Sequence, residues 1–145
     1  MNARGGEKLY TPELLALAVD LAGFPLTEDL TLRGSARSPT CGSRAEVGFS
    51  LSGELVANCG IKTVACAIGQ ASCAILMRSA KGRPIADIVA MPAKVSSWLA
   101  GEDPLPDWPG FDAIEPAREF PARHGAILMP WNAAAEALSN EQAGS

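Results

Sequence analysis

Four cysteines and one histidine are the residues of this chain best suited to sulfur or metal chemistry: Cys41, Cys59, Cys66, Cys73 and His124. A thiolate is both a nucleophile and a ligand for zinc or iron, and a neutral imidazole completes thiolate sites for these metals. The short cysteine spacings typical of zinc fingers are absent. Any metal site must therefore be assembled by the fold from separate segments.

The redox state of the cysteines depends on where the chain resides. In a secreted protein these residues could pair as disulfides, whereas a reducing cytosol keeps thiols free. The apolar stretch between residues 14 and 26 is interrupted by Asp20, which is not the pattern of a signal peptide. We therefore expect a cytoplasmic protein with free thiols.

The segment between residues 44 and 64 has the pattern of a β-hairpin. Apolar residues alternate with small or polar ones from residue 45 to 51, and Ser52 and Gly53 predict a turn into a second strand. Cys41 comes just before the first strand and Cys66 just after the second. Antiparallel pairing brings those two chain ends together, so we expect Cys41 and Cys66 to be neighbours.

Each of these two cysteines has a functional and a purely structural interpretation. Cys41 follows Pro39 and precedes Gly42, so it lies on a turn, where it either reacts or only fills space. Cys66 precedes a predicted helix over residues 67–80. Unpaired backbone N–H groups and the helix dipole would stabilise its thiolate there, unless Cys66 is only a small residue in a tight strand-to-helix corner.

The other candidate residues are expected to contribute less. Cys73 follows Cys66 by two helical turns, about 10 Å of helical rise, and is interpreted as a core residue. Cys59 falls in the middle of a strand and is interpreted as packing in the core or at an edge. His124 is typical of a capping or surface group, but it would give Cys41 and Cys66 a third metal ligand if the fold brought the three together.

The remaining elements complete an α+β protein. Thr11, Pro12 and Glu13 predict the start of a helix that Gly23 and Pro25 end. Residues 26–40 are expected to form a loop or a short irregular strand. Short helices are expected over 85–90 and 92–100. A proline-rich crossing loop that could act as a lid is expected over 102–121, and a last helix is expected to begin at residue 130. These elements predict a small antiparallel sheet packed against helices in two layers.

The composition limits the functions that the chain can have. Its 145 residues carry 12 Lys+Arg against 16 Asp+Glu, a net charge of −4, and 48% are hydrophobic. We expect one domain over residues 1–145, with a loose arm over 1–10 and a polar tail over 139–145. The acidic balance argues against a nucleic-acid partner, and no apolar run is long enough to span a membrane. Motifs for phosphate binding, serine nucleophiles and HExxH zinc sites are also absent.

Three sequence blocks resemble the U-type iron–sulfur cluster scaffolds, the family of IscU, SufU and the N-terminal domain of NifU. Residues 34–43 (GSARSPTCGS) are similar to the block that usually ends in Cys-Gly-Asp. Residues 65–72 (ACAIGQAS) are similar to Gly-Cys-Ala-Ile-Ser-x-Ala-Ser, and residues 120–131 (FPARHGAILMPW) to a block with Arg-x-x-Cys-Ala-x-Leu before a Trp. The long segment between the last two blocks resembles the SufU branch, and the Leu-Pro-Pro-Val-Lys motif of IscU is absent.

The resemblance implies a SufE/NifU-like fold and a role in cluster assembly. Cys41 and Cys66 match the first two ligand cysteines, and His124 falls where some members place a histidine ligand. These residues would then accept sulfur from a cysteine desulfurase and hold a transient [2Fe–2S] centre or zinc for apo iron–sulfur acceptor proteins. Cys66 is the first choice of sulfur acceptor and Cys41 the second, and a homodimer is left open.

Two positions depart from the family pattern: Ser43 replaces the acidic ligand and Gly125 replaces the third cysteine. The leading hypothesis is a divergent scaffold or sulfur-relay protein rather than a true enzyme. The alternative is a docking partner in cluster assembly that keeps the fold and binds no metal. A third hypothesis, a thiol hydrolase, would use Cys66 with His124 as its nucleophile and base.

Overall fold

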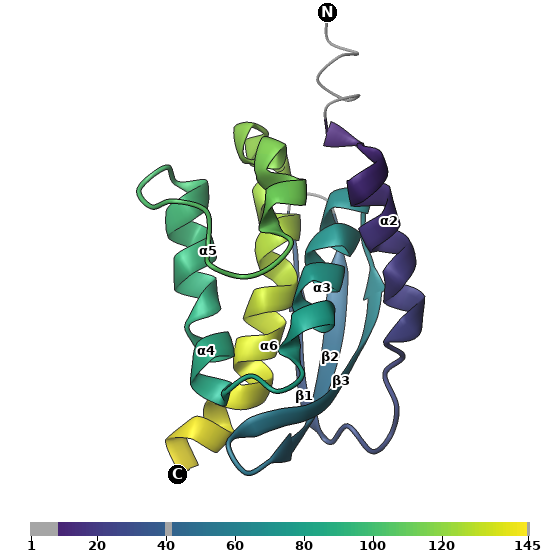
Figure 1. Cartoon of the computed structure of the whole chain (residues 1–145), viewed down its shortest axis with the longest axis vertical. Helices are drawn as coiled ribbons and strands as arrows, with labels where there is room; N and C mark the ends of the chain where they lie inside the picture. Colours follow the sequence, from purple (N-terminus) through teal and green to yellow (C-terminus); the bar gives the residue numbers. More distant parts are fainter. Residues whose placement is uncertain (1–8, 40–41, 145) are drawn as a thin grey trace, which may run out of the picture.

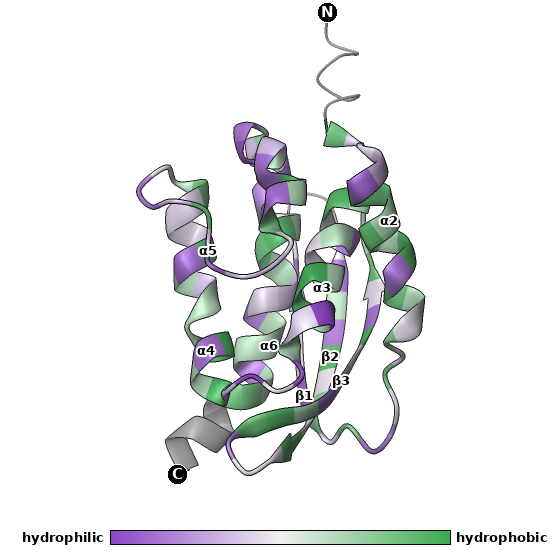
Figure 2. Cartoon of the chain, in the orientation of Figure 1, coloured by the Kyte–Doolittle hydropathy of each residue, from purple (hydrophilic) through white to green (hydrophobic). Residues whose placement is uncertain are grey.

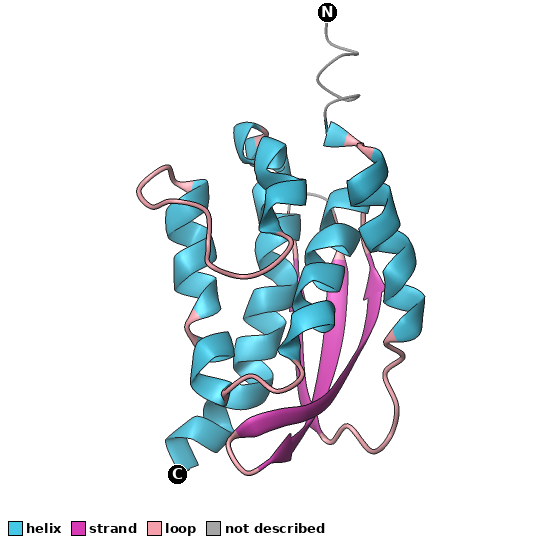
Figure 3. Ribbon diagram, in the orientation of Figure 1, coloured by secondary structure: helices cyan, strands magenta, loops and turns pink. Residues whose placement is uncertain are grey.

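The computed structural model describes residues 9–39 and 42–144, so Cys41 lies outside the described residues. Helices and strands are shown in Figures 1 and 3. In chain order they are α2 (Pro12–Asp20), η1 (Leu21–Gly23), β1 (Leu32–Arg37), β2 (Arg44–Ser52), β3 (Leu55–Val64), α3 (Ala67–Ala80), α4 (Ile85–Val89), α5 (Met91–Leu99), η2 (Phe111–Glu119), η3 (Pro121–Arg123) and α6 (His124–Gly144).

The sheet is antiparallel with the strand order β1-β2-β3. Its register places Gly34 opposite Val47 and Val47 opposite Ile61. Gly53 adopts a φ of 63° in the turn between β2 and β3, a conformation that favours glycine. The predicted hairpin is therefore confirmed. β1 is a regular strand, within the segment where the sequence predicted a loop or a short irregular strand.

One face of the sheet is covered by helices α3 and α6, as the two-layer α+β prediction requires (Figure 1). The alternating residues Val47 and Phe49 of β2 are fully buried on that face. Gly34 lets α6 approach β1 closely, since a methyl group at position 34 would overlap with the backbone at Ala133 and Ala137. Figure 2 shows hydrophobic residues at intervals along the helices that pack on the sheet.

Contacts between β1 and α6 join segments that are far apart in the chain. The backbone N–H of Ser35 donates to Glu136 Oε1 at 3.1 Å, across a separation of 101 residues. Helices α4 and α5 pack on α6 at the side away from α3 (Figure 1). Helix α6 thus contacts both the sheet and the helices α4 and α5.

The N-terminal helix begins as the sequence predicted. Thr11 caps α2 by accepting a hydrogen bond from the backbone N–H of Leu14 at 3.2 Å, and Pro12 occupies the first turn. Leu14 and Leu17 are its buried residues. The described chain is also buried just before this helix, because Leu9 is only 4% exposed.

The proline-rich segment over 102–121 is not a lid, which corrects the prediction made from its prolines. It contains the 3₁₀ helix η2, and Trp108, Phe111 and Ile114 are buried in the core. The indole N–H of Trp108 donates to the Ile75 carbonyl at 2.9 Å, which fixes the segment to α3. Prolines remove backbone donors but leave apolar side chains free to pack, so the segment is irregular and yet part of the core.

The last helix begins six residues earlier than predicted, at His124 rather than at Pro130. Pro130 lies inside α6, where it has no backbone N–H to donate to the preceding turn. The helix continues to Gly144, through the segment after residue 139. None of the helices in the described part of the chain combines the length and the hydropathy needed to cross a membrane.

Candidate thiol site at one end of the sheet

A tight turn connects β1 to β2 at one end of the sheet. The backbone N–H of Ser38 donates to the Ser43 carbonyl at 2.8 Å, and the N–H of Gly42 donates to the Ser38 carbonyl at 3.2 Å. Gly42 adopts a φ of 71°, a backbone conformation that residues with a side chain rarely adopt. Cys41 directly precedes Gly42 in the chain, but its own position lies outside the described residues. Cys41 therefore stays a sequence prediction, and the described residues on either side of it are Ser38, Pro39 and Gly42.

Cys66 lies at the same end of the sheet. Val64, the last residue of β3, pairs with Arg44, the first residue of β2. Cys66 follows two residues later as the N-cap of α3, where its carbonyl accepts from the backbone N–H of Gln70 at 2.9 Å. Its side chain is half-buried and makes no capping hydrogen bond. The predicted position of Cys66 at a helix N-terminus is confirmed.

The start of α6 lies against the start of α3. A methyl group at Gly69 would come within 3.4 Å of the Ala126 Cβ, so the first turns of the two helices are in close contact. His124 and Gly125 immediately precede Ala126 and therefore begin α6 at the end of the sheet that carries Cys66 (Figure 1). This end thus gathers the turn 38–43, Cys66 and His124 from three separate segments.

One ring nitrogen of His124 makes a hydrogen bond that orients the ring. Its Nε2 lies 2.7 Å from the Arg118 carbonyl, and because a carbonyl only accepts, Nε2 carries the proton. The neutral ring then keeps its lone pair on Nδ1, the nitrogen that remains for a metal or a proton. His124 is half-buried, so this nitrogen belongs to a partly exposed side chain.

Cys73 is a core residue as predicted, and Cys59 is half-buried and packs against the core, within the predicted core or edge position. The Cys59 thiol packs against the core and donates to the Met77 carbonyl at 3.6 Å. Cys73 is fully buried, with its sulfur 4.0 Å from Thr63 Oγ1. Burial raises the pKa of Cys59 to about 11 and the pKa of Cys73 to about 12. Both thiols are therefore protonated and poorly nucleophilic near neutral pH.

The described residues do not by themselves form a metal site. In residues 9–39 and 42–144, no group of three or more His, Cys, Asp or Glu side chains is arranged to hold a metal ion. Ser43 is buried and Gly125 offers no side chain at the two positions where the family pattern has ligands. A metal bound at this end would need Cys41 in addition to Cys66 and His124.

The sequence analysis missed two basic residues beside this end. Arg37 and Arg44 face each other across β1 and β2 and flank the turn 38–43. Their charges are visible in the sequence, but only the register of the strands shows that they are paired. A sequence signal for the pair would have required β1 to be predicted as a regular strand.

No family model matches the chain. It is 26% identical over 110 residues to the zinc-dependent sulfurtransferase SufU of Bacillus subtilis, an alignment that covers 74% of this chain and 75% of that protein. The chain is therefore similar to SufU over about three quarters of its length. The resemblance to the U-type scaffolds is therefore supported by an alignment of 110 residues as well as by short motifs.

Solved structures of other proteins have the same fold as this chain. An N-terminal NifU-like protein from Brucella abortus superposes with a TM-score of 0.87 at 22% identity, covering 97% of this chain and 99% of the other. A protein described as an iron–sulfur cluster assembly scaffold of the SUF system from Fervidobacterium islandicum gives a TM-score of 0.81 at 18% identity, covering 90% and 96%. At these identities the likeness shows the fold alone, and the predicted NifU-like α+β fold is confirmed.

Proposed function

We propose that this chain works in iron–sulfur cluster assembly as a sulfur acceptor and scaffold, with Cys66 as the first acceptor. One observation carries the proposal: among the described cysteines, Cys66 alone lies at a helix N-terminus, half-buried and without a capping hydrogen bond. A helix N-terminus generally favours a nearby anionic group, and this is the position that Cys66 occupies at α3. Cys59 and Cys73 are unsuited to the role because burial keeps both thiols protonated.

The proposed chemistry is a thiol–persulfide exchange. The Cys66 thiolate attacks the outer sulfur of a persulfide on the active-site cysteine of a cysteine desulfurase. A new sulfur–sulfur bond forms at Cys66 while the bond within the donor persulfide breaks, and the desulfurase cysteine leaves as a thiolate. Sulfur is transferred without a net change in oxidation state, so the step needs no further oxidant or reductant.

The proposed metal donors are Cys41, Cys66 and His124. Thiolates combined with a neutral imidazole suit zinc, and Nδ1 of His124 has the free lone pair that a ligand needs. A bound zinc ion would keep the thiols deprotonated. A transient [2Fe–2S] centre would be cargo at the same residues, destined for apo acceptor proteins in the cytoplasm.

The proposal is tested by transfer of labelled sulfur. The purified chain is incubated with a cysteine desulfurase and ³⁵S-cysteine, desalted, and separated on a gel without reductant. We expect label on the wild type and on Cys59→Ser, and loss of most of the label in Cys66→Ser. Equal labelling of Cys66→Ser and wild type would overturn the assignment of Cys66. Iron, acid-labile sulfide and zinc are then measured after anaerobic reconstitution, with Cys41→Ser and His124→Ala as the ligand variants.

A second candidate function is docking without metal or sulfur. Ser43 and Gly125 favour it, because both lack the ligand side chains that the family pattern has at these positions. In this case no variant of Cys41, Cys66 or His124 changes binding of the chain to a cysteine desulfurase, and no sulfide is retained. The labelling experiment separates the two functions, since only the first puts ³⁵S on Cys66.

A further inference from the structure

The sheet has a second face, and it is rich in positive charge. The helices cover the side of the sheet that carries Ala45, Val47 and Phe49, and the alternate residues point the other way. On that opposite face lie four of the chain's 12 Lys+Arg residues, together with one carboxylate: Arg33, Arg37, Arg44, Lys62 and Glu46. The chain as a whole carries a net charge of −4, so the positive charge on this face is local.

Half of this face is closed by the chain between η1 and β1. Methyl groups at Gly48 and Gly60 would overlap with Leu30 and with the Pro25 carbonyl, so the two glycines let this segment lie directly on the strands. Arg33 is used to hold it, because Nε donates to the Leu30 carbonyl at 2.6 Å. The covered half therefore has no room for a partner.

The other half of the face is an open groove beside the candidate thiol site. It has a volume of about 520 Å³ and is lined by adjacent segments of the three antiparallel strands, 35–37, 44–46 and 62–64. Val64, at its edge, is 56% exposed. The groove therefore combines strand backbone, one exposed apolar side chain and basic side chains.

Arg37 and Arg44 form no ion pair within the described part of the chain, and Lys62 lies opposite Glu46 in the register without forming an ion pair with it. Arg37, Arg44 and Lys62 are exposed, and the ion pairs of that part are Arg33–Glu46 at 3.5 Å and Arg78–Asp20 at 3.7 Å. Arg37 and Arg44 are directly opposite each other in the register. Like charges in that arrangement are destabilising, so the fold retains a repulsion that negative charge from outside would relieve.

We propose that this groove, defined by Arg37, Arg44, Lys62 and Val64, is the docking surface for an acidic segment of a partner protein. Charge complementarity would guide the segment to the open half of the face, and the apolar Val64 would add contact area. Arg37 and Arg44 flank the turn that precedes β2, so the partner is held beside the segment that contains Cys41. None of the cysteines that the structure describes lines this groove.

The test is an NMR titration of the full ¹⁵N-labelled chain with a short oligoglutamate peptide. The Cys66→Ser variant is used alongside the wild type, so that failure of sulfur transfer and failure of docking are seen separately. We expect amide shifts confined to 35–37, 44–46 and 62–64, equal in both proteins and weaker at high salt. Shifts elsewhere, or none at all, would overturn the proposal.

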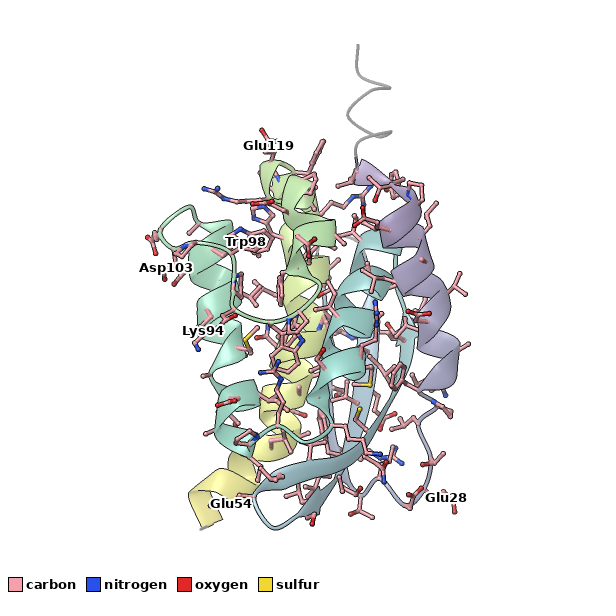
Figure 4. All side chains as sticks on the ribbon, in the orientation of Figure 1. Glu28, Glu54, Lys94, Trp98, Asp103 and Glu119 are labelled. Atoms are coloured by element: carbon pink, nitrogen blue, oxygen red, sulfur yellow. The ribbon has the colours of Figure 1, made fainter. Side chains whose placement is uncertain are left out.

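Charge reversal provides the matched control. Lys62→Glu should weaken peptide binding by about threefold or more, because this cation faces the groove. Lys94→Glu changes the net charge by the same amount on the outer side of α5 and should leave peptide binding unchanged within error (Figure 4). Equal loss in both variants would mean that only net charge matters and would refute a defined groove. Equally tight binding of a single-stranded oligonucleotide at the same amides would also refute it, since any polyanion would then be accepted.

Discussion

The indole N–H of Trp131 on α6 donates a hydrogen bond of 3.0 Å to Ser72 Oγ on α3. Ser72 in turn donates to the Ile127 carbonyl at 2.7 Å, and both side chains are fully buried. This pair of bonds joins the two helices whose first turns carry Cys66 and His124. The polar relay in the core thus maintains the relative position of the candidate site residues.

Ser72→Ala should destabilise the protein by about 1–3 kcal/mol, because it leaves the buried indole N–H without its acceptor. The free energy of unfolding is measured by chemical denaturation. Ser96→Ala, at an exposed position of α5, is the matched control and should change stability by less than about 0.5 kcal/mol. Equal effects of the two substitutions would contradict a structural role for the relay.

Gly34→Ala should be among the most damaging small substitutions in the sheet. The added methyl group would lie 2.6 Å from the Ala137 backbone nitrogen, so α6 would have to move away from β1. We expect a loss of about 3 kcal/mol or more, at the upper end for overpacking. Thermal unfolding of Gly23→Ala provides the comparison, because nothing lies within 4 Å of a methyl group there.

The described cysteines should react with iodoacetamide in a definite order. Cys66 should be alkylated well before Cys59 and Cys73, since burial raises the pKa of those two thiols to about 11 and 12. After alkylation at neutral pH, tryptic peptides are analysed by tandem mass spectrometry, because Cys66 and Cys73 share the peptide 63–78 and only its fragment ions separate their rates. Labelling of Cys73 at the rate of Cys66 in the folded chain would show that the α3 core is open.

The buried thiols should also make stability depend on alkaline pH. The ordinary thiol pKa of 9.0 is raised to about 12 for Cys73 in the folded state, so folding favours the protonated form. This contribution is complete below pH 9 and is lost as the pH rises toward 12, because the unfolded thiol then ionises first. Cys73→Ala, followed by denaturation between pH 8 and 11, should show a shallower decline than the wild type; parallel curves would contradict the assignment.

Arg37→Glu should stabilise the fold while it weakens the proposed docking. It replaces a directly opposed pair of like charges, Arg37 and Arg44, with an opposed pair of opposite charge. The expected gain is about 0.2–1 kcal/mol, measured by chemical denaturation at low salt. Arg44→Glu should give a similar gain, and the double reversal should remove it. A loss of stability in either single variant would show that the pair is not repulsive.

The regular elements were predictable because local chemistry determines them. Alternation defined β2, Ser52 and Gly53 defined the hairpin turn, and Thr11 with Pro12 defined the start of α2. Prediction failed where tertiary contacts override local signals. The prolines over 102–121 indicated a lid, but Trp108 and Phe111 pack in the core, and Pro130 is accommodated inside α6.

The candidate site was predictable only in part, for a related reason. Cys66 at a helix N-terminus follows from local pattern, whereas the opposition of Arg37 and Arg44 depends on a register that no local signal contained. The position of His124 depends on the contact between α3 and α6, which are distant in sequence. Cys41 remains a predicted metal ligand, and that prediction rests on the sequence resemblance.

The contact between Ser35 and Glu136 across 101 residues has a consequence for how the protein is made. Synthesis runs from the N-terminus, so a growing chain has both strands of the hairpin, and Cys66, long before α6 leaves the ribosome. Until then one side of the thiol-bearing end is missing, and contacts of this sequence separation form slowly. The order of synthesis therefore delays completion of this end of the sheet until α6 has been made.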